Sequence, residues 1–245
     1  MKIAKYQGCG NDFIISEDAD FNKLKSNTDI IKKLCQRKYS VGADGFVYLE
    51  KNDKGFRWDF WNADASEAEM CGNAARCVAA YAYDRYQLSQ FVLDTKCGKL
   101  CLAKAGEGYS VEMPKISELK IIQEDVCFIN TGVPHVLLIK PKNEKALIKE
   151  YRYYDNGIDA SGCNVSVVEK DSKGIKVKTF ERGVEGFTLA CGTGAVAAAA
   201  YFHQQQGMND VALSMPGGDL RIRFQSNKVF LEGPALKVFE GEANV

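Results

Sequence analysis

The feature that most constrains the fold of this chain is an internal repeat. The stretch "EMCGNAARCVAAY", which begins at Glu69, is echoed by "LACGTGAVAAAAY" 120 residues later. Cys71 aligns with Cys191, and Gly72 aligns with Gly192. With the same offset, "FVLDTKCGKLCLAKAGEGYSVEM" aligns without a gap with "VALSMPGGDLRIRFQSNKVFLEG". A repeat of this length predicts two units that share one order of elements.

Each repeat predicts a β-rich unit built around one helix. Alternating apolar residues and turn residues indicate the strands, and alanine-rich runs indicate the helices. The first half is predicted to contain strands at 45–50 and 56–62, a helix at 72–85, a hairpin around "KCGK" and a strand near 109–113. The second half is predicted to contain strands at 164–168 and 174–180, a helix at 192–205, a hairpin around "PGGD" and a strand at 228–232. Amphipathic segments at 28–39 and 143–152 give each half a second helix.

The two alanine-rich helices are apolar on nearly every face, which is typical of helices that lie inside a core. We therefore predict an α/β (α+β) fold of two pseudo-symmetric halves. Each half is a curved, mostly antiparallel sheet wrapped around its central helix. The halves are predicted at 1–115 and 116–233, with 234–245 as a segment that packs back on the first half. The active site is expected in the cleft between the halves.

Composition excludes several classes of function. The 245 residues carry 32 Lys+Arg and 32 Asp+Glu, so no net charge favours nucleic acid or an anionic membrane as a partner. The start of the chain lacks the apolar region of a signal peptide, and no apolar run is long enough to span a bilayer. Nine cysteines and two histidines suit a reducing cytoplasm and argue against a Cys/His metal site. We expect a cytoplasmic enzyme of small molecules, with a homodimer as its candidate oligomer.

The repeated cysteines suggest a specific chemistry. A helix N-terminus carries unpaired N–H groups and a partial positive charge, so it favours a thiolate and binds carboxylates. Two thiols in one cleft allow one to remove a proton from a carbon while the other returns a proton on the opposite face. Such a pair would invert an amino-acid stereocentre without pyridoxal phosphate or metal. The alternative is that both are structural cysteines buried at helix ends, which two equivalent positions make less attractive.

Ordered motifs give this chain a resemblance to a known family. It resembles the diaminopimelate epimerases, which are cofactor-independent enzymes of lysine and peptidoglycan precursor synthesis. The resemblance rests on "GCGNDF" at 8–13, "GADG" at 42–45, "NADASEAEMCGNAARC" at 62–77, "TGVPH" at 131–135, "CNVS" at 163–166 and "ERGVEGFTLACGTG" at 181–194. It implies epimerisation of LL-diaminopimelate to the meso form.

The resemblance also implies the roles of individual residues. Cys71 and Cys191 would be the two acid/base thiols. The substrate site would be lined by Asn11, Asn62, Gly72, Asn73, Asn164, Glu181, Arg182, Gly192 and Thr193. Apart from the resemblance, His135 after Pro134 could orient a catalytic carboxylate or amine, or it could be a satisfied core histidine. The lone asparagines have turn formation or capping as their alternative role.

Four departures from the family pattern leave alternatives open. Val133 stands where the family usually has Asn before Pro-His, which removes a polar contact expected at the distal end of the substrate. Cys9 stands where Leu is common, Ala74 stands where Gly is common, and "ERGVEGFT" is one residue longer than usual. A racemase of another amino acid therefore remains an alternative, and a non-catalytic amino-acid-binding homologue is a second.

Overall fold

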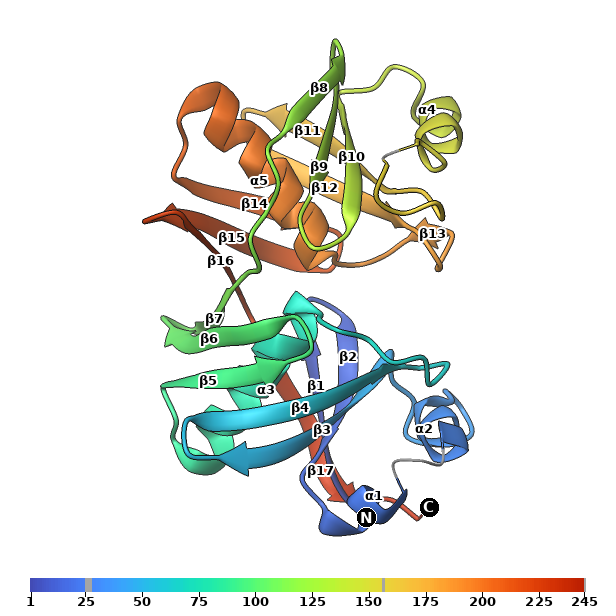
Figure 1. Ribbon diagram of the computed structural model, residues 1–245, viewed down its shortest axis with the longest axis vertical. Helices are drawn as coiled ribbons and strands as arrows, with labels where there is room; N and C mark the ends of the chain where they lie inside the picture. The colour runs from blue at the N-terminus through green and yellow to red at the C-terminus, as the bar shows by residue number, and fades with distance from the viewer. Residues whose placement is uncertain (25–27, 156, 245) are drawn as a thin grey trace. The chain divides into compact units, whose positions relative to one another are not determined.

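A computed structural model describes residues 1–24, 28–155 and 157–244, and it divides the chain into two compact units (Figure 1). The N-terminal unit comprises Met1–Glu112 together with Gly233–Val245. The C-terminal unit comprises Met113–Glu232.

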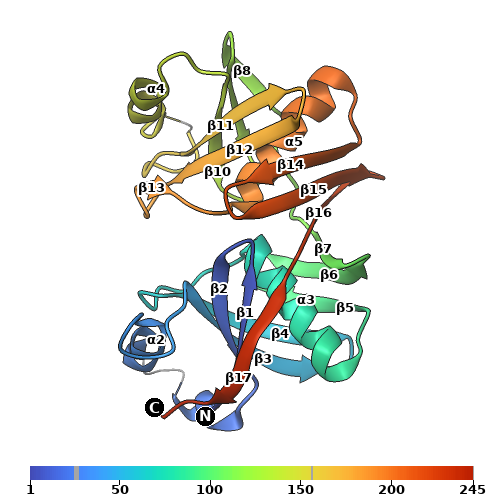
Figure 2. The same cartoon turned by 180° about the vertical axis from the view of Figure 1, so that it is seen from behind.

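The N-terminal unit is a mostly antiparallel sheet. Its strands are β1 (Lys2–Gly8), β2 (Asn11–Ser16), β3 (Gly45–Asn52), β4 (Gly55–Asn62), β5 (Gln90–Thr95), β6 (Gly98–Ala105), β7 (Gly108–Glu112) and β17 (Leu236–Glu242). They pair in the order β17-β1-β2-β3-β4-β5-β6-β7, and only the pairs β2–β3 and β4–β5 are parallel among the described residues. The last strand of the chain therefore lies beside the first (Figure 2).

The C-terminal unit repeats this arrangement. Its strands are β8 (Lys120–Gln123), β9 (Val126–Asn130), β10 (Pro134–Ile139), β11 (Asn164–Asp171), β12 (Gly174–Glu181), β14 (Asp210–Met215), β15 (Gly218–Gln225) and β16 (Lys228–Gly233), with the short β13 (Gly186–Phe187) beside the end of β12. The order is β8-β9-β10-β11-β12-β14-β15-β16, and the parallel pairs, β10–β11 and β12–β14, fall at the same places as in the N-terminal unit. The predicted pseudo-symmetric fold is confirmed.

Each sheet surrounds one alanine-rich helix. Helix α3 (Gly72–Tyr86) contacts β1, β2, β6 and β7, and helix α5 (Gly192–Gln206) contacts β10, β11, β12, β14 and β15. From Ala195 to Ala199 every residue of α5 is fully buried. Small side chains permit this because strands can approach the helix closely on several sides. Both helices extend one residue beyond their predicted ends at 85 and 205.

The amphipathic segments form shorter helices than predicted. Helix α2 (Thr28–Cys35) ends four residues before the predicted limit at 39, because the chain turns there and Lys38 adopts a left-handed conformation with φ of 74°. Helix α4 (Glu144–Tyr151) begins after Asn143, whose side chain accepts a hydrogen bond from the Ala146 amide. A further short helix, α1 (Ala19–Leu24), was not predicted.

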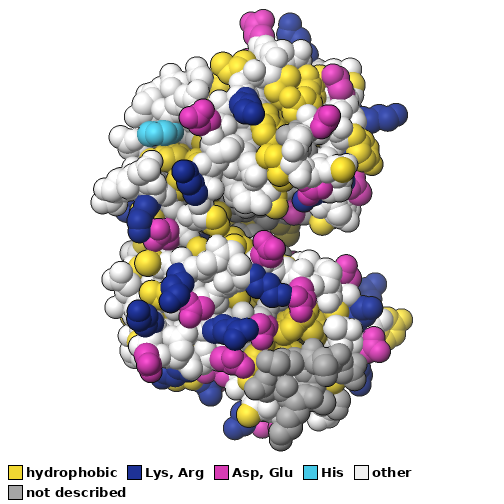
Figure 3. Space-filling view, in the orientation of Figure 1, with side chains coloured by type: hydrophobic (Ala, Val, Ile, Leu, Met, Phe, Trp, Pro, Cys, Tyr) yellow, Lys and Arg dark blue, Asp and Glu magenta, His cyan; other side chains and the backbone are white. Residues whose placement is uncertain are grey.

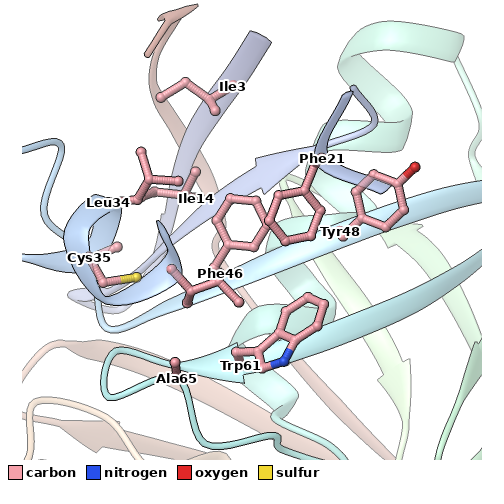
Figure 4. Close-up of a cluster of buried hydrophobic side chains, with 11 residues drawn as sticks. Ile3, Ile14, Phe21, Leu34, Cys35, Phe46, Tyr48, Trp61 and Ala65 are labelled. Atoms are coloured by element: carbon pink, nitrogen blue, oxygen red, sulfur yellow. The ribbon is translucent and has the colours of Figure 1, made fainter. Parts of the chain in front are cut away.

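An aromatic cluster fixes the strands that carry the site in the N-terminal unit (Figure 4). Phe21 packs against Phe46 of β3 with ring centroids 4.6 Å apart and against Trp61 of β4 at 5.7 Å. Leu34 of α2 joins the same cluster. Buried aromatic pairs contribute both apolar area and specific ring geometry. The ends of β3 and β4 are thereby held in place.

Charges of both signs are intermixed on the face of the molecule shown in Figure 3. This agrees with the zero formal net charge of the sequence. Among the residues that the structure describes, no helix is both long and apolar enough to cross a membrane.

The tight packing around α5 predicts the cost of enlarging it. Ala198 is fully buried, whereas Gln205 lies exposed on the last turn of the same helix. We expect Ala198→Leu to lower the free energy of unfolding by about 1–3 kcal/mol because the core has no room for three more carbons. Gln205→Leu is the matched control and should change it by less than about 0.5 kcal/mol. Chemical denaturation measures both, and equal stability of the two variants would contradict a closely packed helix.

Candidate active site

Both predicted catalytic cysteines occupy the same position at the start of a central helix. Cys71 is the N-cap of α3 and Cys191 is the N-cap of α5, each with extended backbone angles. The first helical hydrogen bonds are donated by Ala75 to Cys71 and by Ala195 to Cys191, both at 2.9 Å. Neither thiol caps its own helix. The amides that precede Ala75 and Ala195 therefore have no acceptor within the helix, and they belong to the same first turn as each cysteine.

In the N-terminal unit, the first thiol lies beside a hydrogen-bonded pair of asparagine side chains. Cys71 is partly exposed, and its Sγ lies 3.9 Å from Asn11 Oδ1. Asn73 donates from Nδ2 to the same Asn11 oxygen at 3.0 Å. Asn11 begins β2, and Asn73 belongs to the first turn of α3. Three residues predicted for the site thus meet in this unit.

Asn62 lies at the end of β4 and is held by a turn. Its Nδ2 donates to Ser66 Oγ at 3.0 Å, and its side chain is exposed. In the sheet it pairs with Gly45, and the neighbouring Ala63 amide donates to the Asp44 carbonyl. Asp44 in turn accepts from Asn11. Asn62 therefore lies near the Asn11 side of this half-site.

In the C-terminal unit, the second thiol is buried. Cys191 is 6% exposed, and its Sγ lies 3.4 Å from Thr193 Oγ1. Burial raises the pKa of Cys191, and the negative charge of Glu181 raises it further. The expectation that a helix N-terminus would lower this pKa is therefore wrong for Cys191, because loss of solvent outweighs the helix. Thr188 donates to the Glu181 carboxylate and holds it in this region.

His135 is a buried histidine whose surroundings fix its tautomer. The Arg182 amide donates to Asn164 Oδ1 at 2.8 Å, so Asn164 turns its Nδ2 toward His135 Nε2, 3.3 Å away. A donor facing Nε2 requires that nitrogen to be unprotonated. The proton then lies on Nδ1, which donates to Ser166 Oγ at 3.2 Å. Burial and the nearby Arg182 charge lower the pKa of His135 to about 3, so the ring is neutral.

The neutral ring orients the hydroxyl beside Cys191. Thr193 Oγ1 lies 3.0 Å from His135 Nε2, and with that nitrogen unprotonated the hydroxyl is the donor. The lone pairs of Thr193 are then left for the Cys191 thiol. His135 is fully buried with both ring nitrogens hydrogen-bonded, as predicted for a satisfied core histidine, and an orienting role toward the substrate stays a prediction.

Gly194 permits the helix to come close to this network. A Cβ atom at Gly194 would lie 2.4 Å from Thr179 Oγ1 and 3.0 Å from Ser166 Oγ. Those two hydroxyls are 3.0 Å apart and continue the hydrogen-bond chain from His135. The glycine is therefore needed for close approach between the start of α5 and the sheet.

Arg182 is held by the segment that precedes β11. Its Nη1 binds the carboxylate of Asp159 and also donates to Ser161 Oγ at 2.8 Å and to the Gly162 carbonyl at 3.1 Å. Among the described residues, Nε and Nη2 of Arg182 have no hydrogen-bond partner. Two donors of the guanidinium thus remain for a ligand.

The sequence did not single out several residues that organise the two half-sites. Arg76 contacts Asn73, and Asp44 contacts Asn11. Asp159 holds Arg182. Two of these residues lay in quoted motifs, Asp44 in "GADG" and Arg76 in "NADASEAEMCGNAARC", but neither motif assigned a role to these side chains. Arg76 lay within an alanine-rich helix, where no pattern distinguishes a positioning arginine from an exposed one.

Comparison with solved structures defines the class of fold. A phenazine biosynthesis protein of the PhzF family from Enterococcus faecalis matches over 100% of both chains with a TM-score of 0.74 and 15% identity. A hydroxyproline epimerase from Agrobacterium vitis matches 99% of this chain and 92% of its own, with a TM-score of 0.68 and 13% identity. The class is thus the two-unit fold shared by these PhzF-family and epimerase chains.

Sequence comparison then identifies the family. The model described as diaminopimelate epimerase matches residues 3–117 and 127–238. A diaminopimelate epimerase from Hydrogenobaculum sp. is 39% identical over 271 residues, covering 98% of both chains. One from Methanocella arvoryzae is 35% identical over 274 residues, covering 100% of this chain and 97% of its own. This chain belongs to the diaminopimelate epimerase family, and the predicted resemblance is confirmed.

The buried neutral histidine predicts a pH dependence of stability. Because the pKa of His135 falls from 6.5 to about 3 on folding, the unfolded chain takes up the proton first as the pH drops. The contribution of neutral His135 to the free energy of unfolding is complete above pH 6.5, and it is lost progressively as the pH falls toward 3. Each pH unit in this window should cost up to about 1.4 kcal/mol of unfolding free energy.

Unfolding titrations of two glutamine variants test this dependence. His135→Gln should lose that part of the pH slope, whereas His203→Gln, which replaces the other histidine, should keep it. An unchanged slope in His135→Gln would contradict a neutral buried ring.

Proposed function

We propose that this chain converts LL-diaminopimelate to meso-diaminopimelate by proton transfer at the α-carbon, without a cofactor. Full-length relatives of that name and the equivalent positions of Cys71 and Cys191 support this proposal. The main support is that the buried central helix of each unit begins at a cysteine. The product would supply lysine and peptidoglycan precursors, and the cytoplasm is the expected compartment.

The proposed mechanism uses the two thiols as a pair. One cysteine loses its own proton to solvent as substrate binds and then, as thiolate, takes the α-proton, while the electron pair of the C–H bond passes into the substrate carboxylate. The other cysteine, as thiol, gives a proton to the opposite face of the same carbon, where the electron pair returns to form the new C–H bond, and this cysteine is left as the thiolate. One proton enters and one leaves, so only the configuration changes. Two-base inversion requires both thiols at one carbon, so we propose that the two units bring their helix starts together around the substrate.

The carboxylate that receives this charge needs stabilising donors. The first-turn amides of each central helix are the groups we assign to it, contributed by Gly72 and Asn73 in one unit and by Gly192 and Thr193 in the other. Preorganised N–H donors at a helix N-terminus stabilise charge that develops during reaction. This is how proton removal from a weakly acidic carbon proceeds without an electron-withdrawing cofactor.

We assign recognition of the distal amino-acid end to polar side chains of both units. Asn62, Asn164 and Glu181 offer oxygens to its ammonium, and Arg182 offers Nε and Nη2 to its carboxylate. The Asp159 contact leaves those two nitrogens available and fixes the plane of the guanidinium. The Val133 side chain can form no hydrogen bond, so this end depends more heavily on Arg182.

Replacement of each catalytic thiol tests the mechanism. Cys71→Ala and Cys191→Ala should each lower kcat by about 10²-fold or more, because proton transfer on one face is lost. Cys97→Ala is the matched control, since Cys97 is exposed in the β5–β6 hairpin. Conversion of LL to meso substrate is followed by chiral chromatography. Full turnover by either thiol variant would reject the two-base scheme.

Deuterium incorporation tests the substrate. Incubation in deuterated water with diaminopimelate, lysine, histidine, glutamate or proline separately should label the α-carbon of diaminopimelate alone. Mass spectrometry reads the label. Label in another amino acid only would favour the racemase alternative, and no label in any would favour a binding homologue.

Arg182 tests the distal contact. Arg182→Met should lower kcat/KM for diaminopimelate by a factor equivalent to about 2–5 kcal/mol, because a carboxylate would be buried without its charged partner. Arg182→Lys keeps the charge but loses the two-pronged contact, so its loss should be intermediate. Equal kcat/KM for wild type and Arg182→Met would remove Arg182 from the distal site.

A further inference from the structure

A continuous chain of side-chain hydrogen bonds runs past the first thiol. Arg76 donates from Nη2 to Asn73 Oδ1 at 3.0 Å. Asn73 donates from Nδ2 to Asn11 Oδ1 at 3.0 Å, and Asn11 donates from Nδ2 to Asp44 Oδ2 at 2.7 Å. The Cys71 sulfur lies 3.9 Å from the middle of this chain, at Asn11 Oδ1. We call these four residues, Arg76, Asn73, Asn11 and Asp44, the amide relay.

The direction of the amide relay is fixed from both ends. A guanidinium can only donate, so the Asn73 atom that faces Arg76 must be its oxygen. The Asn73 nitrogen then faces Asn11 and requires an oxygen there. At the other end, an ionised Asp44 can only accept, which places the Asn11 nitrogen on its side. Both ends give one assignment, so neither amide can turn over without losing two hydrogen bonds.

The Asp44 end of the relay is itself held by several polar contacts. Asp44 Oδ1 accepts from Arg37 Nη2 at 2.8 Å, and its Oδ2 also accepts from the Asp12 amide at 3.2 Å. Arg37 binds the Asp12 carboxylate as well, and Lys5 lies 2.9 Å from the same carboxylate. The relay thus ends in a network of charges rather than in one exposed side chain.

The burial of the Arg76 side chain in the core costs stability. Its side chain is fully buried, it has no carboxylate partner among the described residues, and its Nη1 atom has no hydrogen-bond partner there. Further polar contacts join Nε to the Pro234 carbonyl at 3.4 Å and Nη2 to Cys9 Sγ at 3.9 Å. A buried charge without a counter-ion destabilises a fold. Its hydrogen bond to Asn73 gives it a role other than stability.

We propose that Arg76 and Asp44 are positioning residues that keep the Asn11 oxygen facing Cys71, so that this thiol is held protonated before substrate binds. An acceptor opposite a thiol stabilises S–H and opposes ionisation, whereas an amide nitrogen there would favour the thiolate. The proposal rests on the proposed role of Cys71 in proton transfer. It assigns Asp44 and Arg76 a function that acts through Asn11 and not through substrate.

Other ionisable groups near Cys71 could also alter its ionisation. Arg76 favours the thiolate by charge, and Cys9, Cys77 and Asp12 surround the same region. Burial raises the pKa of Cys77, which keeps it a neutral thiol. A test must therefore separate the orientation of Asn11 from the loss of a charge.

Two substitutions at Asp44 make that separation. Asp44→Asn removes the charge but can keep an oxygen toward Asn11, whereas Asp44→Ala removes the acceptor and lets the Asn11 amide turn over. Arg37→Met is the matched control, because it removes the ion pair and leaves the Asp44 acceptor in place. The rate of Cys71 alkylation by iodoacetamide is measured against pH, with peptide mass spectrometry to distinguish Cys71 from the other cysteines.

We expect Asp44→Ala to lower the pH midpoint of Cys71 alkylation by about one unit, which is about tenfold faster alkylation below the midpoint. Asp44→Asn and Arg37→Met should stay within a few tenths of the wild-type midpoint. Equal shifts in Asp44→Asn and Asp44→Ala would mean that charge alone acts, and no shift in either would also overturn the proposal. Alkylation needs no turnover, so this result is separate from the test of epimerase activity.

A measurement on the wild-type enzyme covers the case in which Asp44→Ala does not fold. Isotope labelling permits detection of a scalar coupling across the hydrogen bond between Asn11 Nδ2 and the Asp44 carboxylate carbon. We expect this coupling at neutral pH. Its absence, with freely exchanging Asn11 amide protons, would overturn the fixed orientation of Asn11.

Discussion

The start of each central helix at a cysteine is the constraint on which the site depends. A helix N-terminus leaves amides without helical partners, and those of α3 and α5 adjoin the sulfurs of Cys71 and Cys191. Both helices are alanine-rich because strands pack against several of their faces. The same composition that buries the helix therefore fixes where its first turn, and hence its thiol, lies within the unit.

The repeat in the sequence predicted the fold better than it predicted the site. The alanine-rich runs identified both central helices to within a residue. A helix buried on nearly all sides is a continuous run of small apolar residues, so its ends show directly in the sequence. Strands β1, β2, β9 and β10 were not assigned, because they have weak turn signals and no alignment within the repeat. Asn11 and His135 lie on two of these strands, so their contacts could not be derived from spacing.

The electrostatics of the second thiol were also beyond the sequence. A cysteine at a helix N-terminus suggests a lowered pKa, but the extent of burial is a property of the whole unit. Cys191 is buried beside Glu181, and both effects favour the neutral thiol. Arg76 illustrates the same limit, since nothing in "NAARC" indicates that this arginine is fully buried. The burial of both side chains depends on packing between residues that are far apart in the sequence.

The two units share the same strand pairings, but the polar side chains at equivalent positions differ. In the N-terminal unit Phe13 pairs with Gly45 across parallel strands, and in the C-terminal unit His135 pairs with Asn164 at the same point. This register makes Val133 the counterpart of Asn11. The departure at Val133 therefore falls where the first unit places the acceptor for its thiol. In the second unit the Thr193 hydroxyl lies beside the sulfur instead.

A common physical rule nevertheless governs both half-sites. Each thiol faces an oxygen whose orientation is determined by a donor that cannot act as an acceptor. For Cys71 the donor is the Arg76 guanidinium, acting through Asn73 and Asn11. For Cys191 it is the Arg182 amide, acting through Asn164 and His135 on Thr193. Amides, hydroxyls and neutral imidazoles can each donate or accept a hydrogen bond. The direction of the hydrogen bonds in a chain of such groups is therefore fixed only when one end is a group that can only donate or only accept. The different residues in the two units are thus alternative ways of presenting an acceptor to a thiol.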